Sequence, residues 1–164
     1  LQAMGATIEV SGERVSGGEP VADITVRTAQ LHGATVAGDL VPRAIDELPL
    51  VAVLGCFADG ETVVRDAGAL RVKESDRVEA VVSVLSRMGA RITPREDGFV
   101  VRGRTRLRGA HLDAGGDHRI GMLGAVAGLL AEGQTRVVND AVAVSYPDFW
   151  GAVRNAATSQ PSLL

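Results

Sequence analysis

Residues 58–62 read Ala-Asp-Gly-Glu-Thr, and 73 positions later residues 131–135 read Ala-Glu-Gly-Gln-Thr. Two more pairs recur in the same order: Met-Gly-Ala stands at 4–6 and again at 88–90, and Leu-His-Gly-Ala at 31–34 returns as Leu-Arg-Gly-Ala at 107–110. The offsets of 84, 76 and 73 residues differ by short deletions only. An internal repeat decides the architecture of a chain. We therefore expect two copies of one structural unit.

Apolar periodicity and turn residues predict matching elements in the two copies. In the first copy, strands are expected at 7–10, 24–28 and 61–65 and helices at 45–58 and 75–88. In the second copy, we expect strands at 90–93, 99–102 and 134–139, a short strand before Asp113, and helices at 118–131 and after Pro147. Strands that alternate with helices predict an α+β fold in which helices cover mixed sheets.

The predicted elements group into two units, one of which is split between the two ends of the chain. Residues 34–102 form a complete βαβαββ unit, residues 1–28 and 103–154 together supply a second one, and residues 155–164 are expected to be a flexible tail. The leading strands at 4–28 should then complete the sheet of the trailing βαβα segment, within one chain or by exchange between two chains. A strand-exchanged homodimer is therefore one expected assembly.

The composition is that of an ordinary globular protein, with 164 residues, 46% hydrophobic and 23% charged. A net charge of −3 argues against a dedicated nucleic-acid or membrane-surface protein. The apolar runs at 48–58 and 120–131 are shorter than the roughly 20 residues that span a bilayer. The single Cys56 excludes an internal disulfide and favours a reducing, cytoplasmic setting. Because Leu1 opens a stretch that already reads as structured, we expect a piece of a longer chain.

Arg102, Arg104, Arg106 and Arg108 alternate and would share one face of an extended strand. Such a row of cations could contact nucleic acid, or it could be a solvated edge that charge protects from aggregation. No aromatic platform accompanies the arginines, as single-strand binders usually require. The solvated edge is the favoured interpretation.

Three charged groups lie where an apolar face or a helix start is predicted. Residues 71–77, Arg-Val-Lys-Glu-Ser-Asp-Arg, extend the apolar stripe of the next helix onto Glu74 and Arg77. Because buried charge without a partner is costly, this cluster is either a satisfied ion-pair network or a functional site. Asp46 begins an otherwise apolar helix, where a carboxylate usually complements the dipole. Residues 115–119, Gly-Gly-Asp-His-Arg, put backbone amides and a guanidinium at another helix start, which suits an anion.

The repeat predicts that these groups meet. Asp46 and residues 117–119 occupy matching helix starts, and residues 73–77 and 145–148 occupy the other matching pair. Helix starts that point to one surface would form an electropositive rim that carries Lys73, Arg77 and Arg119, with the carboxylates of Asp46 and Glu74 among them. Such a rim suits a polyanionic small molecule and can move protons.

The same elements resemble the EPSP synthase family (3-phosphoshikimate 1-carboxyvinyltransferases). The resemblance covers nearly all of residues 1–150 and is carried, in the family's order and spacing, by residues 71–77, Ile45–Glu47, Asp117–Arg119 and Ser145–Phe149. It implies the enolpyruvyl-transferase fold, with two globular halves of three βαβαββ units each, of which this chain resembles the C-terminal part. It also implies transfer of the enolpyruvyl group of phosphoenolpyruvate to the 5-hydroxyl of shikimate 3-phosphate. That reaction passes through a tetrahedral intermediate that loses phosphate, with no cofactor and no metal.

Carried over by motif, the resemblance assigns a role to each of the five charged residues. Asp46 would be the catalytic carboxylate near the shikimate hydroxyl and would also touch that substrate, while Glu74 would exchange the proton at the methylene carbon. Lys73 would bind shikimate 3-phosphate, and Arg77 and Arg119 would clamp phosphoenolpyruvate. The chain departs from the pattern at Val144, where many members carry a Lys.

The resemblance also implies that part of the site is elsewhere. The Lys-Ser and Ser-Ser-Gln elements that hold the shikimate phosphate in the family have no counterpart in these 164 residues. The missing half of the parent chain is therefore an expected partner, and the chain alone is expected to be inactive. One alternative is UDP-N-acetylglucosamine enolpyruvyl transferase, which normally uses a Cys on a mobile loop, whereas Cys56 lies in a predicted buried helix. Another is a non-catalytic binding or structural module whose charges form ion-pair networks only.

Overall fold

The computed structural model describes residues 1–138 and 141–158 of the chain. The first copy of the repeat comprises the elements η1 (Gln2–Met4), β1 (Thr7–Ser16), β2 (Glu19–Arg27), β3 (Thr35–Val36), α1 (Leu40–Arg43), α2 (Leu48–Phe57), β4 (Glu61–Val64) and η2 (Gly68–Val72). The chain continues through α3 (Arg77–Arg87), β5 (Arg91–Arg95), β6 (Gly98–Arg102), β7 (His111–Asp113), α4 (His118–Leu129), β8 (Arg136–Val138), α5 (Val142–Ser145) and α6 (Phe149–Thr158). Each copy thus runs as an antiparallel hairpin, a strand–helix–strand crossover and a further helix, which agrees with the predicted mixed sheets covered by helices.

The backbone reproduces the repeat at matching positions. The amide of His32 donates to the Met4 carbonyl at 2.9 Å, and the amide of Arg108 donates to the Met88 carbonyl at 2.8 Å. At Gly33 an added Cβ would overlap the backbone of Glu61, and at Gly109 it would overlap the backbone of Gln134 in the same way. These close approaches explain why glycine recurs at both sites.

Three sheets form within the described residues. The largest has the strand order β3-β4-β6-β5, in which β3 and β4 are parallel and the β5–β6 hairpin adds antiparallel to β4. Its inner face is buried, with Val64, Phe99 and Val101 completely covered. The second sheet is the parallel pair β7–β8, and the third is the β1–β2 hairpin.

One apolar core joins the two copies, because α2, α3 and α4 pack against one another. The predicted stripe of α3 is confirmed: Val78, Val81 and Leu85 are fully buried. Burying each such side chain contributes on the order of 1.5–3 kcal/mol. The packing of these three helices brings their first turns close together, and this is where the charged residues lie.

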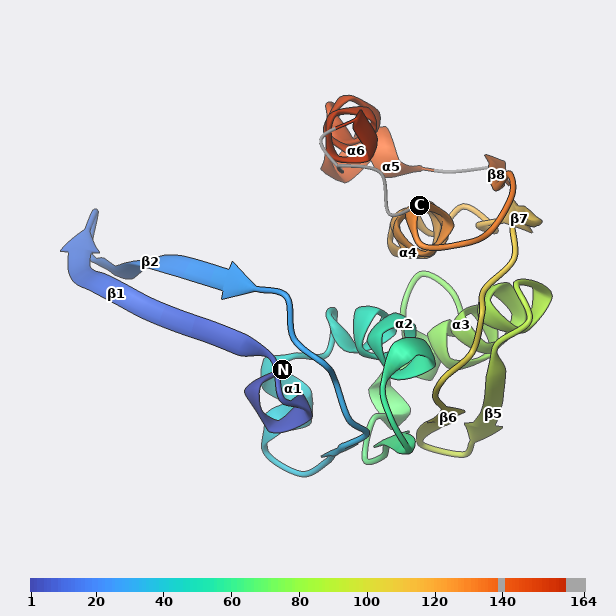
Figure 1. Ribbon diagram of the computed structural model, residues 1–164, viewed down its shortest axis with the longest axis horizontal. Coiled ribbons are helices and arrows are strands. Elements are labelled where there is room, and N and C mark those ends of the chain that lie inside the picture. The colour runs from blue at the N-terminus through green and yellow to red at the C-terminus, as the bar shows by residue number, and fades with distance from the viewer. Residues whose placement is uncertain (139–140, 159–164) are drawn as a thin grey trace.

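The hairpin differs from the prediction. Among the described residues β1 and β2 pair only with each other, with Thr7 opposite Arg27, and they project from the body as an arm (Figure 1). The expected completion of the trailing sheet within one chain is therefore wrong: β8 does not receive β2. The apolar side chains of the arm stay in solvent as a result, with Ile24 and Val26 about two-thirds exposed, at 67% and 66%.

Predicted boundaries also change: β1 runs to Ser16 where a strand is expected at 7–10, and β2 begins at Glu19 where one is expected at 24–28. Residues 155–158, expected in the flexible tail, form the last turn of α6, while residues 159–164 lie outside the described residues. The helix expected at 45–58 begins only at Leu48, because residues 44–47 form a turn after α1. Asp46 therefore precedes α2 instead of lying within it.

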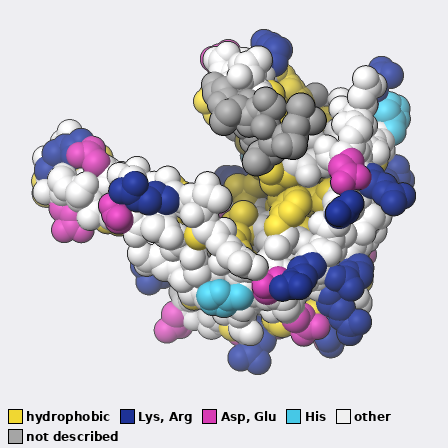
Figure 2. Space-filling view, viewed as in Figure 1, with side chains coloured by type: hydrophobic (Ala, Val, Ile, Leu, Met, Phe, Trp, Pro, Cys, Tyr) yellow, Lys and Arg dark blue, Asp and Glu magenta, His cyan; other side chains and the backbone are white. Residues whose placement is uncertain are grey.

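Exposed apolar surface also lies on the body of the molecule. Figure 2 shows apolar side chains at the bottom of a hollow beside the arm. A cavity of about 430 Å³ is lined by apolar residues of α1, α2 and α4 together with Leu1. Leu50 and Leu130, both in this lining, are more than 40% exposed. Surface of this kind usually marks a contact with further protein.

Candidate active site

Three segments that are far apart in the sequence deliver the charged residues to one place. The turn at 44–47 carries Asp46. The second segment, which leads into α3, carries Lys73, Glu74 and Arg77, the first residue of that helix. The third segment is the start of α4, where Arg119 follows His118. Two of these segments belong to the first copy of the repeat and one to the second. The cluster therefore forms only where the two copies meet.

Arg77 is the centre of the cluster and is 1% exposed. Its Nε donates to Asp117 Oδ2 at 2.9 Å, its Nη1 to Asp46 Oδ1 at 3.0 Å, and its Nη2 to Glu74 Oε2. Burial would lower the pKa of the guanidinium, but Asp117, Glu74 and Asp46 outweigh this effect and raise that pKa. Arg77 is thus a permanent buried cation that three carboxylates share.

Asp117 is the buried counterpart of Arg77, with no exposed surface. It is the N-cap of α4 and accepts a hydrogen bond from the Arg119 amide at 2.9 Å. Its Oδ2 accepts a second bond from the Ser75 hydroxyl at 2.8 Å. Burial would raise the pKa of this carboxyl, but the bonds from Arg77, Ser75 and the Arg119 amide together lower it. Asp117 is therefore ionised wherever the protein is folded near neutral pH.

Asp46 does not cap its helix. The N-cap of α2 is Glu47, which makes no side-chain capping bond. The Asp46 carboxylate instead accepts a hydrogen bond from Arg77 and forms ion pairs with Arg119 Nη2 at 3.1 Å and Lys73 Nζ at 3.8 Å. The usual role of a carboxylate at a helix start does not apply to this one.

The cluster has an inner and an outer layer. Arg77 and Asp117 are buried, whereas the side chains of Lys73, Asp46 and Arg119 are about one-third exposed and that of Glu74 is 54% exposed. Three cations and three carboxylates balance, so the expected electropositive rim does not come from side-chain charge alone. The first turns of α3 and α4 add partial positive charge at the same place. The outer residues can meet a ligand while the inner pair holds them.

The structure brings together the five residues expected at the site, which are Asp46, Lys73, Glu74, Arg77 and Arg119. It adds two residues to which the sequence analysis gives no role, Asp117 and Ser75. Asp117 stands in the quoted motif at 117–119, but only Arg119 was assigned a role. A signal for it existed: an arginine at a helix start requires a counterion, and Asp117 immediately precedes that helix. Ser75 had no comparable signal, because nothing local to its sequence indicates a partner 42 residues away.

Arg71, in the same motif as Arg77, has a different task. Its Nε and Nη2 donate to the carbonyls of Glu96 and Arg95, both at 2.6 Å, and its Nη1 donates to Asp76 at 2.7 Å. It therefore ties the start of α3 to the β5–β6 turn. The motif combines a fold-stabilising arginine with a site arginine.

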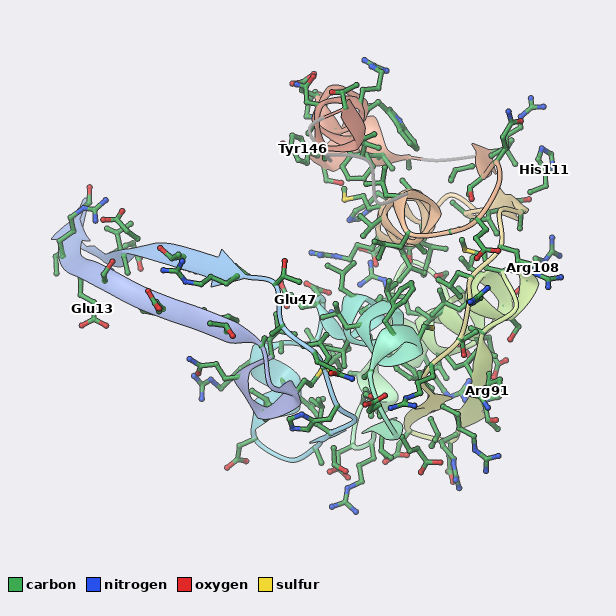
Figure 3. All side chains as sticks on the ribbon, in the orientation of Figure 1. Glu13, Glu47, Arg91, Arg108, His111 and Tyr146 are labelled. Atoms are coloured by element: carbon green, nitrogen blue, oxygen red, sulfur yellow. The ribbon has the colours of Figure 1, made fainter. Side chains whose placement is uncertain are left out.

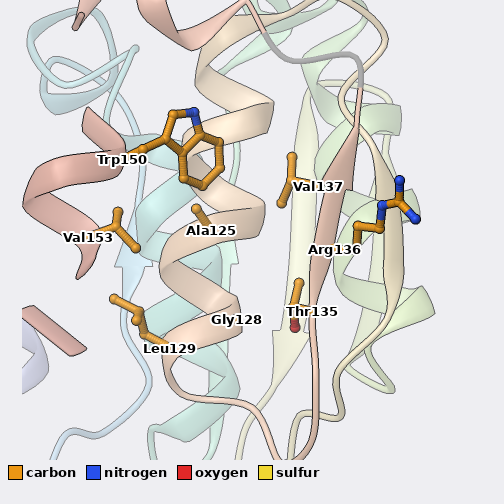
Figure 4. A pocket seen from close by; sticks show the side chains of 8 residues that line it. All are labelled: Ala125, Gly128, Leu129, Thr135, Arg136, Val137, Trp150 and Val153. Atoms are coloured by element: carbon orange, nitrogen blue, oxygen red, sulfur yellow. The ribbon is translucent and has the colours of Figure 1, made fainter. Parts of the chain in front are cut away.

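Other features of the surface do not offer comparable chemistry. The pocket of about 480 Å³ between α4, α6 and β8 is mostly apolar, and Arg136 is the one charged residue in its lining (Figure 4). Cys56 is fully buried, burial raises the pKa of its thiol to about 12, and its Sγ donates to the Ala52 carbonyl at 3.3 Å. In residues 1–138 and 141–158, no group of His, Cys, Asp and Glu is arranged to hold a metal ion. The charged cluster remains the candidate site.

The four arginines do not share one face of a strand, because β6 ends at Arg102 and the backbone at Arg104 has a φ of 51°. Their ion pairs still favour a solvated surface over a contact with nucleic acid. Arg102 faces Glu61 at 3.6 Å, Arg104 pairs with Asp59, and Arg106 lies 3.9 Å from Glu132. Figure 3 shows Arg108 on the outer side of the body, near His111. Most of the row is thus neutralised by neighbouring carboxylates.

Comparison with known proteins identifies the family. The family model of EPSP synthase (3-phosphoshikimate 1-carboxyvinyltransferase) matches residues 1–153. The chain belongs to the EPSP synthase family. A 3-phosphoshikimate 1-carboxyvinyltransferase of Roseiflexus sp. is 52% identical over 158 residues, which are 96% of this chain and 36% of the relative. One from Herpetosiphon aurantiacus is 54% identical over 151 residues, 92% of this chain and 35% of the relative.

Solved structures agree. An EPSP synthase from Acinetobacter baumannii superposes with a TM-score of 0.89 at 38% identity, covering 96% of this chain and 37% of that one. The enolpyruvyl transferase NikO from Streptomyces tendae shares the fold, with a TM-score of 0.62 at 21% identity. The chain spans about one-third of the length of these EPSP synthase relatives. In the part of the chain that the structure describes, every helix is too short or too polar to cross a bilayer.

The buried pair gives the first prediction. Asp117→Leu should lower the free energy of unfolding by about 3–5 kcal/mol, because it leaves Arg77 with only its two partly exposed partners, Asp46 and Glu74, and no buried one. Adding Arg77→Met should recover most of the loss, since it removes that charge. Urea denaturation of the single and double variants measures both effects. A double variant that is less stable than Asp117→Leu alone would contradict a direct pairing.

The same variants also test how the free energy of unfolding depends on pH. The folded-state pKa of Asp117 is lowered, so its contribution is present above the unfolded pKa of about 3.9 and is lost as the pH falls through the folded pKa. The stability of the unchanged chain should therefore fall more steeply below about pH 4 than that of the double variant.

Proposed function

We propose that this chain forms part of an enzyme that transfers the enolpyruvyl group of phosphoenolpyruvate to the 5-hydroxyl of shikimate 3-phosphate, with release of phosphate. The observation that carries the proposal is that Asp46 and Glu74 both accept hydrogen bonds from the buried Arg77, while Arg119 and Lys73 form ion pairs with Asp46. Membership of the EPSP synthase family supports it. We also propose a cytoplasmic location, which the lone buried Cys56 supports.

Both steps of the reaction need groups that move protons. In the addition step, the hydroxyl oxygen bonds to C2 of phosphoenolpyruvate, the hydroxyl proton leaves to a carboxylate, and the methylene carbon gains a proton. In the elimination step, the bond from C2 to the phosphate oxygen breaks, and the methyl carbon loses a proton. We assign Asp46 to the hydroxyl and Glu74 to the methylene carbon. Glu74 is the more exposed of the two, which suits a group that must exchange its proton.

The cations supply charge compensation for the substrates. Arg119 and Lys73 are exposed enough to contact an anionic substrate directly, and both form ion pairs with Asp46. An incoming phosphate or carboxylate therefore competes with Asp46 for them and loosens its ion pairs. We assign Lys73 to shikimate 3-phosphate and Arg119 to phosphoenolpyruvate, and we assign Arg77, which is 1% exposed, to phosphoenolpyruvate once Asp46 or Glu74 gives up its hydrogen bond. Fixed guanidinium groups stabilise the developing charge without reorganising.

The two alternatives are less well supported. The UDP-N-acetylglucosamine enolpyruvyl transferase reaction would require a reactive thiol, and burial holds the pKa of Cys56 far above neutrality. A non-catalytic module accounts for the buried Arg77–Asp117 pair but leaves the partly exposed Lys73 and Arg119 beside Asp46 without a purpose.

A chimeric enzyme tests the proposal. Residues 1–153 replace the matching segment of the Roseiflexus relative, which supplies the rest of the chain. The chimera should turn over both substrates, and the 164-residue chain alone should not, because the elements expected to hold shikimate phosphate lie outside it. Asp46→Asn in the chimera should lower kcat by at least about 100-fold, as expected for a proton-transferring carboxylate. Asp23→Asn, on the exposed hairpin, is the matched control. Equal rates for the two variants would sink the assignment of Asp46.

The exposed hairpin points to a second partner. β8 matches β4 by the 73-residue offset, and β4 pairs with β6 through Val63 opposite Val100. The 73-residue offset makes Arg136 the equivalent of Val63, and aligning residues 24–27, Ile-Thr-Val-Arg, with residues 99–102, Phe-Val-Val-Arg, makes Thr25 the equivalent of Val100. In the absence of the remaining parent chain, we propose that β2 of one copy pairs antiparallel with β8 of a second copy in this register. The exposed Ile24 and Val26 then lie on the same side as Val137, and the apolar face is covered.

Engineered cysteines test the register. A chain with Thr25→Cys and Arg136→Cys should form a disulfide-linked dimer under mild oxidation, because the two residues lie opposite each other in the proposed ladder. The control pairs Thr25→Cys with Val137→Cys, which would lie on opposite faces of the sheet. Non-reducing electrophoresis measures the linked fraction. Monomer in both variants, or equal dimer in both, would refute the exchange.

A further inference from the structure

Ser75 makes an unusual hydrogen bond for its position. It stands two residues before α3, one position ahead of the N-cap that normally supplies the capping side chain. Here Asp76 is the N-cap and accepts from the Glu79 amide at 3.1 Å. The Ser75 hydroxyl instead crosses to the second copy of the repeat and donates to Asp117 Oδ2 at 2.8 Å. The α3 cap is complete without Ser75, so its hydroxyl serves the contact between the copies.

The Ser75 hydroxyl donates to the same carboxylate oxygen of Asp117 that accepts a hydrogen bond from Arg77. Asp117 Oδ2 also accepts Arg77 Nε at 2.9 Å, while Asp117 Oδ1 is held by the Arg119 amide at 2.9 Å and by Arg77 Nη2 at 3.4 Å. The Arg119 amide and the Ser75 hydroxyl therefore fix one oxygen each. Together they set the plane of the carboxylate, and that plane sets the orientation of the guanidinium fork.

The orientation of Arg77 in turn fixes the two proposed catalytic carboxylates. Its Nη1 binds Asp46 and its Nη2 binds Glu74. We propose that Ser75 is a positioning residue of the enolpyruvyl-transfer site, acting through Asp117 to aim the Arg77 guanidinium. Ser75 itself touches neither substrate in this scheme. The effect of Ser75 on catalysis rests on the proposed function. Its effect on the orientation of the Arg77 guanidinium rests on the hydrogen bonds alone.

The kinetic test uses the chimera with the Roseiflexus relative. Ser75→Ala should raise KM for phosphoenolpyruvate about tenfold, the usual effect of losing one hydrogen bond to a charged group, and should lower kcat, because the displaced Arg77 also holds Asp46 and Glu74. Ser75→Thr keeps the hydroxyl and should restore the original KM. Ser83→Ala, an exposed serine of the same helix, is the matched control. A KM for phosphoenolpyruvate that is equal in Ser75→Ala and Ser83→Ala overturns the proposal.

A second readout separates this inference from the proposed function. In the 164-residue chain with ¹⁵N-labelled arginine, the buried Arg77 Nε–H should give a slowly exchanging NMR signal. Ser75→Ala should accelerate its exchange at least about tenfold, and Ser75→Thr should not. An inactive chimera with this exchange pattern would refute the proposed function and leave the positioning role standing. An exchange rate unchanged by Ser75→Ala would refute the positioning role, whatever the chimera does.

Discussion

The buried pair of Arg77 and Asp117 is the interaction on which the rest of the structure depends. One partner begins α3 in the first copy of the repeat and the other caps α4 in the second. Either charge alone would be costly to bury. The helix start of each copy is therefore stable only when the other copy supplies the opposite charge. The same contact fixes the geometry of the site. Fold and site therefore rest on a single constraint.

The layered arrangement around this pair explains how an enzyme keeps charged groups both precise and available. The inner residues are dry and fully hydrogen-bonded, so they hold their positions without competition from water. The outer residues, Lys73, Asp46, Glu74 and Arg119, keep contact with solvent. Since the described charges balance, specificity comes from where each group is held and not from a net field.

Much of this was predictable from the sequence, for identifiable reasons. The repeat offsets gave the element order, and the stripe of α3 with its charged extension at Glu74 and Arg77 located the site. Asp117 was overlooked because an acid before a helix has an ordinary explanation as a cap, which it also fulfils. The position of Asp46 in a turn and the isolation of the β1–β2 arm depend on tertiary packing, which local patterns do not contain.

The claim that Arg77 orients the phosphoenolpyruvate end of the site is tested most directly by Arg77→Lys. Lysine keeps the positive charge but lacks the planar fork that three carboxylates share. Isothermal titration calorimetry of the chimera should show phosphoenolpyruvate affinity falling at least about tenfold, with shikimate 3-phosphate affinity unchanged. Unaltered affinity for phosphoenolpyruvate would mean that the buried guanidinium serves the fold alone.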